Sequence, residues 1–374
     1  MPTDAPPLAG LKVVELARIL AGPWAGQVLA DLGAEVIKVE SPDGDDTRRW
    51  GPPFITNPDG SEDAAYFHAA NRGKTSEVVD FGTPEGQARV RELIADADVV
   101  IENFKVGGLA KYGLDYASLA QLNPRLVYCS ITGFGQDGPY AGRAGYDFII
   151  QGMSGIMDLT GDPAGAPQKI GVAYADILTG LYAVIGIQAA LAEREVSGRG
   201  QQVDMALLDV MVGTLANQAM NYLASGKAPT RLGNAHPNIA PYEAFACDDG
   251  WLILAVGNDR QFQRFCEVAD ITPRAEWASN ASRVEHRAAL SQTIADALAS
   301  WKRADLLTAL ESANVPAGPI NNVAEALADP QVRHRAMQLE MERGDGAGVP
   351  GIGLPIRFSR SGLAAPKPSP PKGG

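Results

Sequence analysis

The stretch from Gly171 to Leu191 carries a single carboxylate, Asp176, at the head of a segment that is otherwise almost entirely apolar. A helix that is apolar on nearly every face is expected to be buried, and a buried carboxylate has to be paired, used as a cap or used in chemistry. In one interpretation Asp176 is the helix N-cap, a position that favours Asp. In the other, Asp176 lies near helix N–H groups, away from bulk water, and attacks an activated acyl group as a covalent nucleophile.

The side chains that could hold a metal or form disulfides are scattered. The three cysteines are odd in number and far apart, which indicates neither a disulfide framework nor a C-x-x-C metal site. The four histidines show no H-E-x-x-H or other paired spacing, so we expect no dedicated metal site. These residues are Cys129, Cys247, Cys266, His68, His236, His286 and His334.

The composition is that of a soluble globular protein, with 374 residues of which 45% are hydrophobic, and the length suggests two or three domain-sized units. A net charge of −12 argues against partners such as nucleic acid or an anionic membrane, because both are bound mainly by clustered Lys and Arg. The segment after Asp176 comes nearest to a membrane span, but Tyr182, Gln188 and its glycines are more typical of a protein core. We therefore expect a cytoplasmic protein that meets any anionic ligand with a few local cations.

Strand and helix signals alternate in the first half of the chain. Thr83 followed by Pro84 is a typical helix start, and a further helical stretch covers residues 22–32. This alternation predicts an α/β fold with a parallel sheet covered on both faces, whose ligands collect at the carboxyl ends of the strands. The expected strands cover residues 11–16, 34–40, 98–103 and 126–134.

The pattern changes beyond about Ala224. A loop-like stretch rich in Gly, Pro and Asn is followed by a strand signal at 250–256 and a mostly helical signal at 258–312, which indicates a second, smaller α+β domain. The tail from Ala364 is rich in proline and is expected to be disordered or extended.

One motif raises a different class of enzyme. Residues 133–138 fit G-x-G-x-x-G and follow a predicted strand, as in the nicotinamide-linked oxidoreductases. That fingerprint needs the third glycine to open a helix that holds a pyrophosphate. Pro139, Tyr140 and Gly142 follow here and indicate a loop, so a dinucleotide site is only a remote alternative.

Eight motifs occur in the order and at the spacings of a known family. The chain resembles the family III CoA-transferases, also called CaiB/BaiF, which include formyl-CoA transferases, carnitine CoA-transferases and α-methylacyl-CoA racemases. The resemblance covers nearly the whole chain. The motifs lie at Arg18–Trp24, Asp31–Glu40, Asn71–Lys74, Ile101–Phe104, Gly145–Asp147, Asp176–Gly180, Gly198–Gln201 and Val315–Pro319.

The resemblance implies a Rossmann-like large domain with a parallel sheet, a smaller α+β domain and a homodimer of interlocked chains. The large domain would comprise residues 1–224, the small domain with its linkers 225–320, and a return segment with the tail 321–374. The substrates would be an acyl-CoA and a free carboxylic acid, with coenzyme A carried as a substrate and no separate cofactor.

The family's covalent nucleophile is an aspartate at the head of a helix, and the matching position is Asp176. The resemblance implies that Ile19 and Leu20 line the adenine and pantetheine path. Asn103 and Phe104 would contact the pantetheine, and Lys111 the phosphates. Further cations are needed for the phosphates in so acidic a chain. The candidates are Lys74, Lys105 and Arg143.

Family racemases pair the matching acid with a histidine in the Gly-x-Asp motif, as opposed acid and base. Tyr146 occupies that position here, and a phenol with a pKa near 10 is a poor proton acceptor at neutral pH. We therefore expect CoA transfer, with 2-methylacyl-CoA racemisation as the alternative.

The chain departs in two places from the sequence pattern of many relatives. Ser41 replaces an Arg of many relatives, which moves its expected phosphate contact to Arg48 or Arg49. The segment 232–243 resembles the carnitine and dicarboxylate branch of the family.

Overall fold

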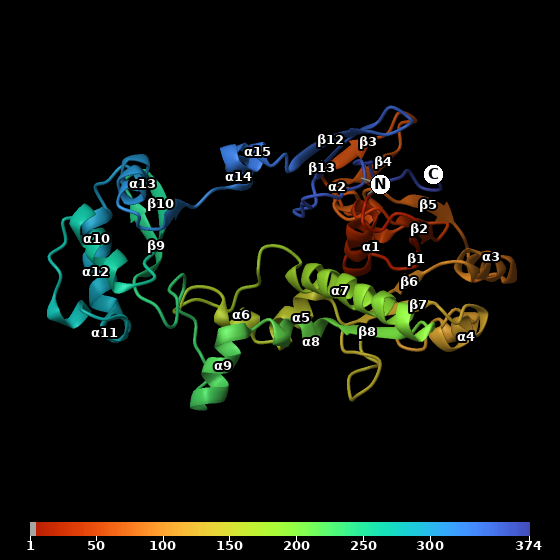
Figure 1. Cartoon of the computed structure of the whole chain (residues 1–374), viewed down its shortest axis with the longest axis horizontal. Helices are drawn as coiled ribbons and strands as arrows, with labels where there is room; N and C mark the ends of the chain where they lie inside the picture. The colour runs from red at the N-terminus through yellow and green to blue at the C-terminus, as the bar shows by residue number, and fades with distance from the viewer. Residues whose placement is uncertain (1–4) are drawn as a thin grey trace. The chain divides into compact units, whose positions relative to one another are not determined.

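The computed structural model describes residues 5–374, which form two compact units (Figure 1). The first unit comprises the chain up to Ile156 together with Lys169–Leu223 and Pro330–Gly374, and the second comprises Met157–Gln168 and Ala224–Asp329. Residues 157–168 were predicted to lie in the large domain. They group with the second unit, where the guanidinium of Arg231 donates to the carbonyl and the carboxylate of Asp158.

A six-stranded parallel sheet forms the centre of the first unit, in the order β5-β2-β1-β6-β7-β8. The mixed α/β class predicted from the sequence is therefore confirmed. The two edge strands, β5 and β8, were not predicted from the sequence. The strands are β1 (Lys12–Glu15), β2 (Glu35–Glu40), β5 (Thr75–Val78), β6 (Val99–Glu102), β7 (Val127–Thr132) and β8 (Gln202–Ala206).

Successive residues of a strand point to opposite faces of the sheet. Both faces are apolar here, and helices cover both. Val13 and Val99 lie in the core under α1 (Ala21–Asp31) and α7 (Tyr174–Ser197), whereas Val14 and Val100 lie in a separate core under α3 (Pro84–Ala95) and α4 (Tyr116–Leu122). In Figure 1, α3 and α4 stand together on the other side of the strands from α7. The predicted helix start holds, since Thr83 accepts from the backbone N–H of Gly86.

Shorter elements complete the first unit and connect its strands. Two hairpins, β3–β4 and β12–β13, are antiparallel. The helices are η1 (Asp46–Arg49), α2 (Ala65–His68), η2 (Ala110–Tyr112), α5 (Asp147–Met153), α8 (Leu207–Gly213) and α15 (Pro330–His334), and the hairpin strands are β3 (Phe54–Thr56), β4 (Glu62–Ala64), β12 (Gln338–Glu342) and β13 (Gly348–Ile352). Two more helices begin in the first unit and end in the second, namely α6 (Ile156–Leu159) and α9 (Ala216–Ser225).

The second unit packs helices against a three-stranded antiparallel sheet in the order β11-β10-β9. Its core contains Leu252 and Leu254 from the central strand together with Phe265 and Trp277. The elements are β9 (Tyr242–Cys247), β10 (Gly250–Ala255), β11 (Ala317–Pro319), α10 (Asp259–Val268), η3 (Ala275–Trp277), α11 (Asn280–Glu285), α12 (Arg287–Leu298), α13 (Arg303–Ser312) and α14 (Val323–Ala328).

The proline-rich tail is extended and lies against the first unit. The backbone N–H of Ser76, on edge strand β5, donates to the carbonyl of Gly374 at 2.7 Å, and the N–H of Gly373 donates to the Ser76 hydroxyl at 3.0 Å. Ser369 is fully buried and hydrogen-bonds His68. Of the two states expected for this tail, the structure shows the extended one, held by backbone hydrogen bonds.

Helix α7 is less buried than its composition predicted. Ala183 and Ile187 lie in the core against the sheet, but Leu181, Tyr182 and Ile185 are 39%, 44% and 61% exposed. By length and hydropathy alone α7 would suffice to cross a membrane. Its packing against α1 and the sheet is that of a core helix with one apolar face left open.

Candidate active site

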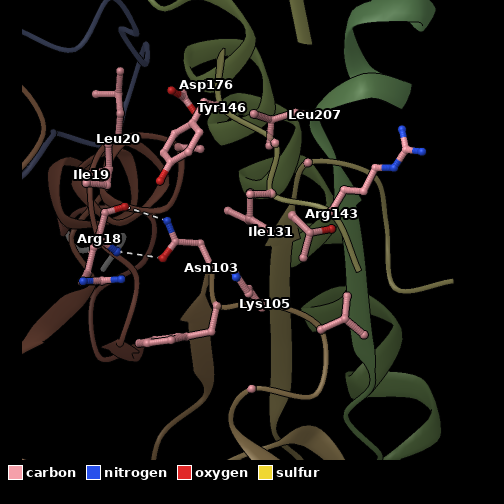
Figure 2. A pocket seen from close by; sticks show the side chains of 18 of the residues that line it. Arg18, Ile19, Leu20, Asn103, Lys105, Ile131, Arg143, Tyr146, Asp176 and Leu207 are labelled. Carbon is pink, nitrogen blue, oxygen red and sulfur yellow. Dashed lines mark hydrogen bonds between the residues drawn. The ribbon is translucent and has the colours of Figure 1, made fainter. Parts of the chain in front are cut away.

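A cavity of about 730 Å³ opens at the carboxyl ends of β1, β6 and β7. Parallel α/β sheets place their ligands at this edge, and the volume lies in the usual range for small-molecule sites. The segments that follow the three strands supply much of the wall, and the start of α7 adds Asp176 (Figure 2). The lining residues include Arg18, Ile19, Leu20, Ala21, Asn103, Phe104, Lys105, Lys111, Arg143, Tyr146, Asp147 and Asp176.

Asp176 lies in the first turn of α7 and is not its N-cap. The N-cap is Ala173, which makes no side-chain cap bond. The carboxylate of Asp147 takes over this role from outside the helix, because it accepts from the N–H of Ala175 at 2.8 Å. The cap interpretation of Asp176 is therefore wrong, and its side chain is left to line the cavity.

A close contact between two helices sets the position of Asp176. One turn further along α7, a Cβ on Gly180 would lie 2.7 Å from the carbonyl oxygen of Ala21 in α1. No real side chain tolerates that distance, so only glycine lets the two helices approach this closely. The contact brings the start of α7 against the start of α1, and Ala21 and Asp176 consequently line the same cavity.

The surroundings of Asp176 oppose its ionisation. Burial raises the pKa of this carboxyl to about 7, and the negative charge of Asp147 adds to the increase. Near neutral pH the group is therefore divided between its acid and its carboxylate. A poorly solvated carboxylate of raised basicity, facing a cavity, is a candidate nucleophile or base.

Asn103, directly after β6, fixes the loop that follows β1 in the cavity wall. Its side-chain oxygen accepts from the N–H of Arg18 at 2.9 Å, and its side-chain nitrogen donates to the carbonyl of Arg18 at 2.7 Å (Figure 2). Both functions of the amide therefore hold the loop that presents Ile19 and Leu20. These two residues and Phe104, all predicted to contact CoA, line the cavity.

Three of the predicted phosphate-binding cations are brought together around the cavity. Lys105, Lys111 and Arg143 all line it and are exposed, and within residues 5–374 no carboxylate forms an ion pair with any of them. Arg143 stacks on Tyr140 at 4.0 Å, and Lys111 lies over Tyr112 at 4.6 Å. Their charges are thus open to an anionic ligand.

Arg18 is a further cation of the cavity and was not predicted from the sequence. It lines the wall, pairs with Asp46 at 3.2 Å and lies over the ring of Phe104 at 5.5 Å. Its place directly after the first predicted strand could have indicated this position, because that is the edge at which ligands of parallel sheets bind.

Two other cations that were predicted to bind phosphates, Lys74 and Arg48, do not line the cavity. Lys74 is fully buried and pairs with Glu15 at 2.8 Å, and burial lowers the pKa of its ammonium to about 8. Arg48 is also buried and pairs with Glu40 at 2.6 Å and Asp63 at 3.1 Å. Both charges neutralise buried carboxylates, so neither reaches the cavity.

Tyr146 lines the cavity and is 66% exposed. In the view of Figure 2 it stands at the same end of the cavity as Asp176. No histidine is among the described residues that line this cavity. His68, in the first unit, is instead buried beside Ser369, and burial lowers its pKa to about 4. The racemase alternative needs a second base, and no histidine among the described lining residues provides it.

The G-x-G-x-x-G segment has a structural role. No helix begins at Gly138, which has a φ of +81°, and the next helix, α5, starts at Asp147. A Cβ on Gly133 would lie 2.5 Å from the Cα of Gly145, so the two glycines allow the end of β7 to pack on the loop before Tyr146. The dinucleotide interpretation is therefore wrong in its central requirement, a helix that holds the pyrophosphate.

Comparison with known proteins identifies the family. The family model described as CoA-transferase family III matches residues 8–374. The chain belongs to this family. A succinate–glutarate CoA-transferase of Agrobacterium fabrum is 59% identical over 100% of this chain and 94% of its own length, and a human succinyl-CoA:glutarate CoA-transferase is 40% identical over 97% and 83%. The protein is thus an enzyme, a family III CoA-transferase.

A solved structure agrees with this family assignment. The crystal structure of a CaiB/BaiF family protein from Brucella suis has a TM-score of 0.90 and 60% sequence identity, and the match covers 99% of this chain and 97% of that one. The resemblance stated from the eight motifs is confirmed.

Proposed function

We propose that this enzyme exchanges CoA between a dicarboxylic acyl-CoA such as succinyl-CoA and a free dicarboxylic acid such as glutarate. The observation that carries the proposal is a carboxylate with a raised pKa, Asp176, in a cavity lined by the open cations Lys105, Lys111 and Arg143. The choice of acids is supported by the bacterial and human relatives that are named for succinate or succinyl-CoA and glutarate.

The proposed reaction begins at the thioester. The ionised oxygen of Asp176 attacks the thioester carbonyl, the C–S bond breaks, and a mixed anhydride and CoA thiolate result. The thiolate then attacks the aspartyl carbonyl of the anhydride, which releases the first acid as its carboxylate and leaves an aspartyl-CoA thioester.

The second half repeats these steps in reverse with the incoming carboxylate. The carboxylate attacks the aspartyl-CoA thioester and displaces CoA thiolate, and the thiolate attacks the new acyl carbonyl. The products are the new acyl-CoA and the free Asp176 carboxylate. No proton or electron is gained or lost, and one thioester replaces another of similar energy, so the exchange needs no ATP.

The protein's contribution is orientation and exclusion of water. Holding thiolate and anhydride in place can lower the barrier by about 7–11 kcal/mol, and one well-placed oxyanion donor by about 3–4 kcal/mol. Tyr146 is a candidate donor because its side chain lines the same cavity as Asp176. Water must be kept from the anhydride, which it would hydrolyse.

The open apolar face of α7 supports a homodimer as the working assembly, as the resemblance implies. Leu181 and Ile185 lie four residues apart and therefore on one side of the helix. Together with Tyr182 they leave apolar surface exposed on α7, the helix that also carries Asp176. We infer that a second copy of the chain covers this face, and that the enzyme works in the cytoplasm.

The test is a transfer assay read by mass spectrometry. The enzyme is incubated with succinyl-CoA and a panel of free mono- and dicarboxylic acids, and the new acyl-CoA is quantified. Formation of glutaryl-CoA with a preference over monocarboxylic acids is expected. Deuterium exchange at the α-carbon of a 2-methylacyl-CoA, at a rate comparable to transfer, would instead support the racemase alternative.

A further inference from the structure

The loop between β1 and α1 contains an unfavourable backbone conformation. Ile19 has a φ of +72°, in the left-handed region that β-branched residues rarely adopt. Of the five non-glycine residues with positive φ in the described part of the chain, Ile19 is the β-branched one, and it also lines the active-site cavity. Backbone strain at such a place persists only where surrounding groups hold it.

Two side chains hold this loop from different elements. Asn103, directly after β6, accepts from the N–H of Arg18 and donates to its carbonyl. Asp45 holds the next peptide, because its carboxylate accepts the N–H of Ile19 with one oxygen at 3.3 Å and the other at 3.4 Å. Asp45 does not line the cavity, so its effect on a ligand passes through Ile19.

Asp45 is itself firmly fixed. It is 1% exposed and caps η1 by accepting from the N–H of Thr47 at 2.9 Å and from its hydroxyl at 2.7 Å. The second carboxylate oxygen pairs with the ammonium of Lys38 at 2.9 Å, and Lys38 also pairs with Glu15 at 3.0 Å. The orientation of the carboxylate is therefore set by three donors before it meets Ile19.

We propose that Asp45 is a positioning residue for CoA transfer: its buried carboxylate holds the N–H of Ile19 and so keeps the left-handed backbone that places Ile19 and Leu20 in the wall of the cavity beside Asp176. Released from Asp45, an isoleucine returns to the extended or helical regions, and the entry into α1 at Ala21 moves with it. The effect on turnover rests on the proposed function, whereas the effect on the Ile19 backbone does not.

The test measures the effect of Asp45→Ala, which removes both oxygens that accept from Ile19, in three backgrounds with Ile, Ala or Gly at position 19. Alanine and glycine at position 19 both remove the side chain beyond Cβ, but only glycine adopts a positive φ without cost. We expect Asp45→Ala to lower kcat/KM for acyl-CoA by roughly ten- to a hundredfold with Ile19. The loss should persist with Ile19→Ala and shrink to about threefold or less with Ile19→Gly.

The matched control is Asp63→Ala, which removes a buried, ion-paired carboxylate whose partners are Arg48 and Asn57 rather than the 18–20 loop. Its kcat/KM should not depend on whether position 19 is Ile or Gly. Thr47→Val loosens Asp45 without changing the buried charge, and it provides the same three-background comparison if Asp45→Ala does not fold. Equal losses in all three backgrounds would overturn the proposal.

A second readout needs no activity. Hydrogen exchange of the Ile19 amide in the ligand-free enzyme should accelerate at least tenfold in Asp45→Ala and stay unchanged in Asp63→Ala. An unchanged Ile19 amide in Asp45→Ala refutes the inference whatever the substrates are. If the wild-type protein transfers no CoA while its Ile19 amide behaves as expected, the proposed function fails and the positioning role of Asp45 stands.

Discussion

A carboxylate that attacks a thioester has to be ionised, and the surroundings of Asp176 hold its pKa near 7. We therefore expect kcat/KM to rise about tenfold per pH unit below pH 7 and to level off above it. Asp147→Asn removes the neighbouring negative charge and keeps an oxygen to accept from Ala175, so the midpoint should move to lower pH. A pH–rate profile that is flat between about pH 5 and about pH 8 contradicts this assignment.

The same raised pKa has a consequence for stability. In the unfolded chain Asp176 ionises near its ordinary pKa, whereas the folded protein keeps the proton up to about pH 7. The folded state thus binds more protons in this interval, and the contribution of Asp176 to stability falls as pH rises. Asp176→Asn should therefore raise the melting temperature more at about pH 8 than at about pH 5, relative to wild type at the same pH.

Loss of the nucleophile should abolish transfer. Asp176→Ala is expected to retain less than about a thousandth of the transfer rate. Acyl-CoA followed by hydroxylamine should modify Asp176 in the wild-type protein, as seen by peptide mass spectrometry. Asp209, an exposed acid on α8, is the control, and Asp209→Ala should keep both activity and labelling at Asp176.

Lys111 is predicted to contribute to binding only. It lies at the cavity, exposed and without an ion pair among the described residues, and the substrate phosphates would stay in place throughout the reaction. Lys111→Ala should therefore raise KM for acyl-CoA several-fold and leave kcat nearly unchanged. A fall in kcat alone would assign Lys111 to the chemical step instead.

At the scale of the elements, the α1–α7 contact carries the active site. Gly180→Ala places a Cβ 2.7 Å from the Ala21 carbonyl, so α7 has to move away and take Asp176 with it. We expect both a lower melting temperature and at least a tenfold loss of kcat. Gly213→Ala in α8 is the matched control. Its Cβ would meet open space, and the change should be neutral or stabilise the helix by about 0.5–1 kcal/mol.

The elements also show how far the sequence could be interpreted. The central strands were predictable because parallel strands buried on both faces are continuous apolar runs. The edge strands β5 and β8 were missed because they lack a continuous apolar run: Thr75–Val78 contains a single apolar residue, and Gln202–Ala206 is a five-residue segment with only isolated apolar positions before Met205. Asp176 was found from its apolar surroundings and its motif. Lys74 and Arg48 were misassigned because spacing along the chain does not reveal which carboxylates, here Glu15 and Glu40, fold against them.

At the scale of the whole molecule, the open face of α7 predicts self-association. Ile185→Glu places a charge in the middle of that face, and the protein should become monomeric in light scattering coupled to size-exclusion chromatography. Leu122→Glu, at an exposed apolar position on α4, is the control and should leave the oligomeric state unchanged. A wild-type protein that is monomeric at micromolar concentration contradicts the dimer.

The first unit is assembled from three separated stretches of chain, and this affects how the protein emerges from the ribosome. The N–H of Ser76 on β5 finds its acceptor at Gly374, and Arg48 finds one at the carbonyl of Pro370. During translation, residues 330–374 emerge after Ala224–Asp329, which can already collapse around its own core, so the contacts of Ser76 and Arg48 with the tail form last. Until then the outer edge of β5 lacks its acceptor at Gly374 and is open to pairing with another strand.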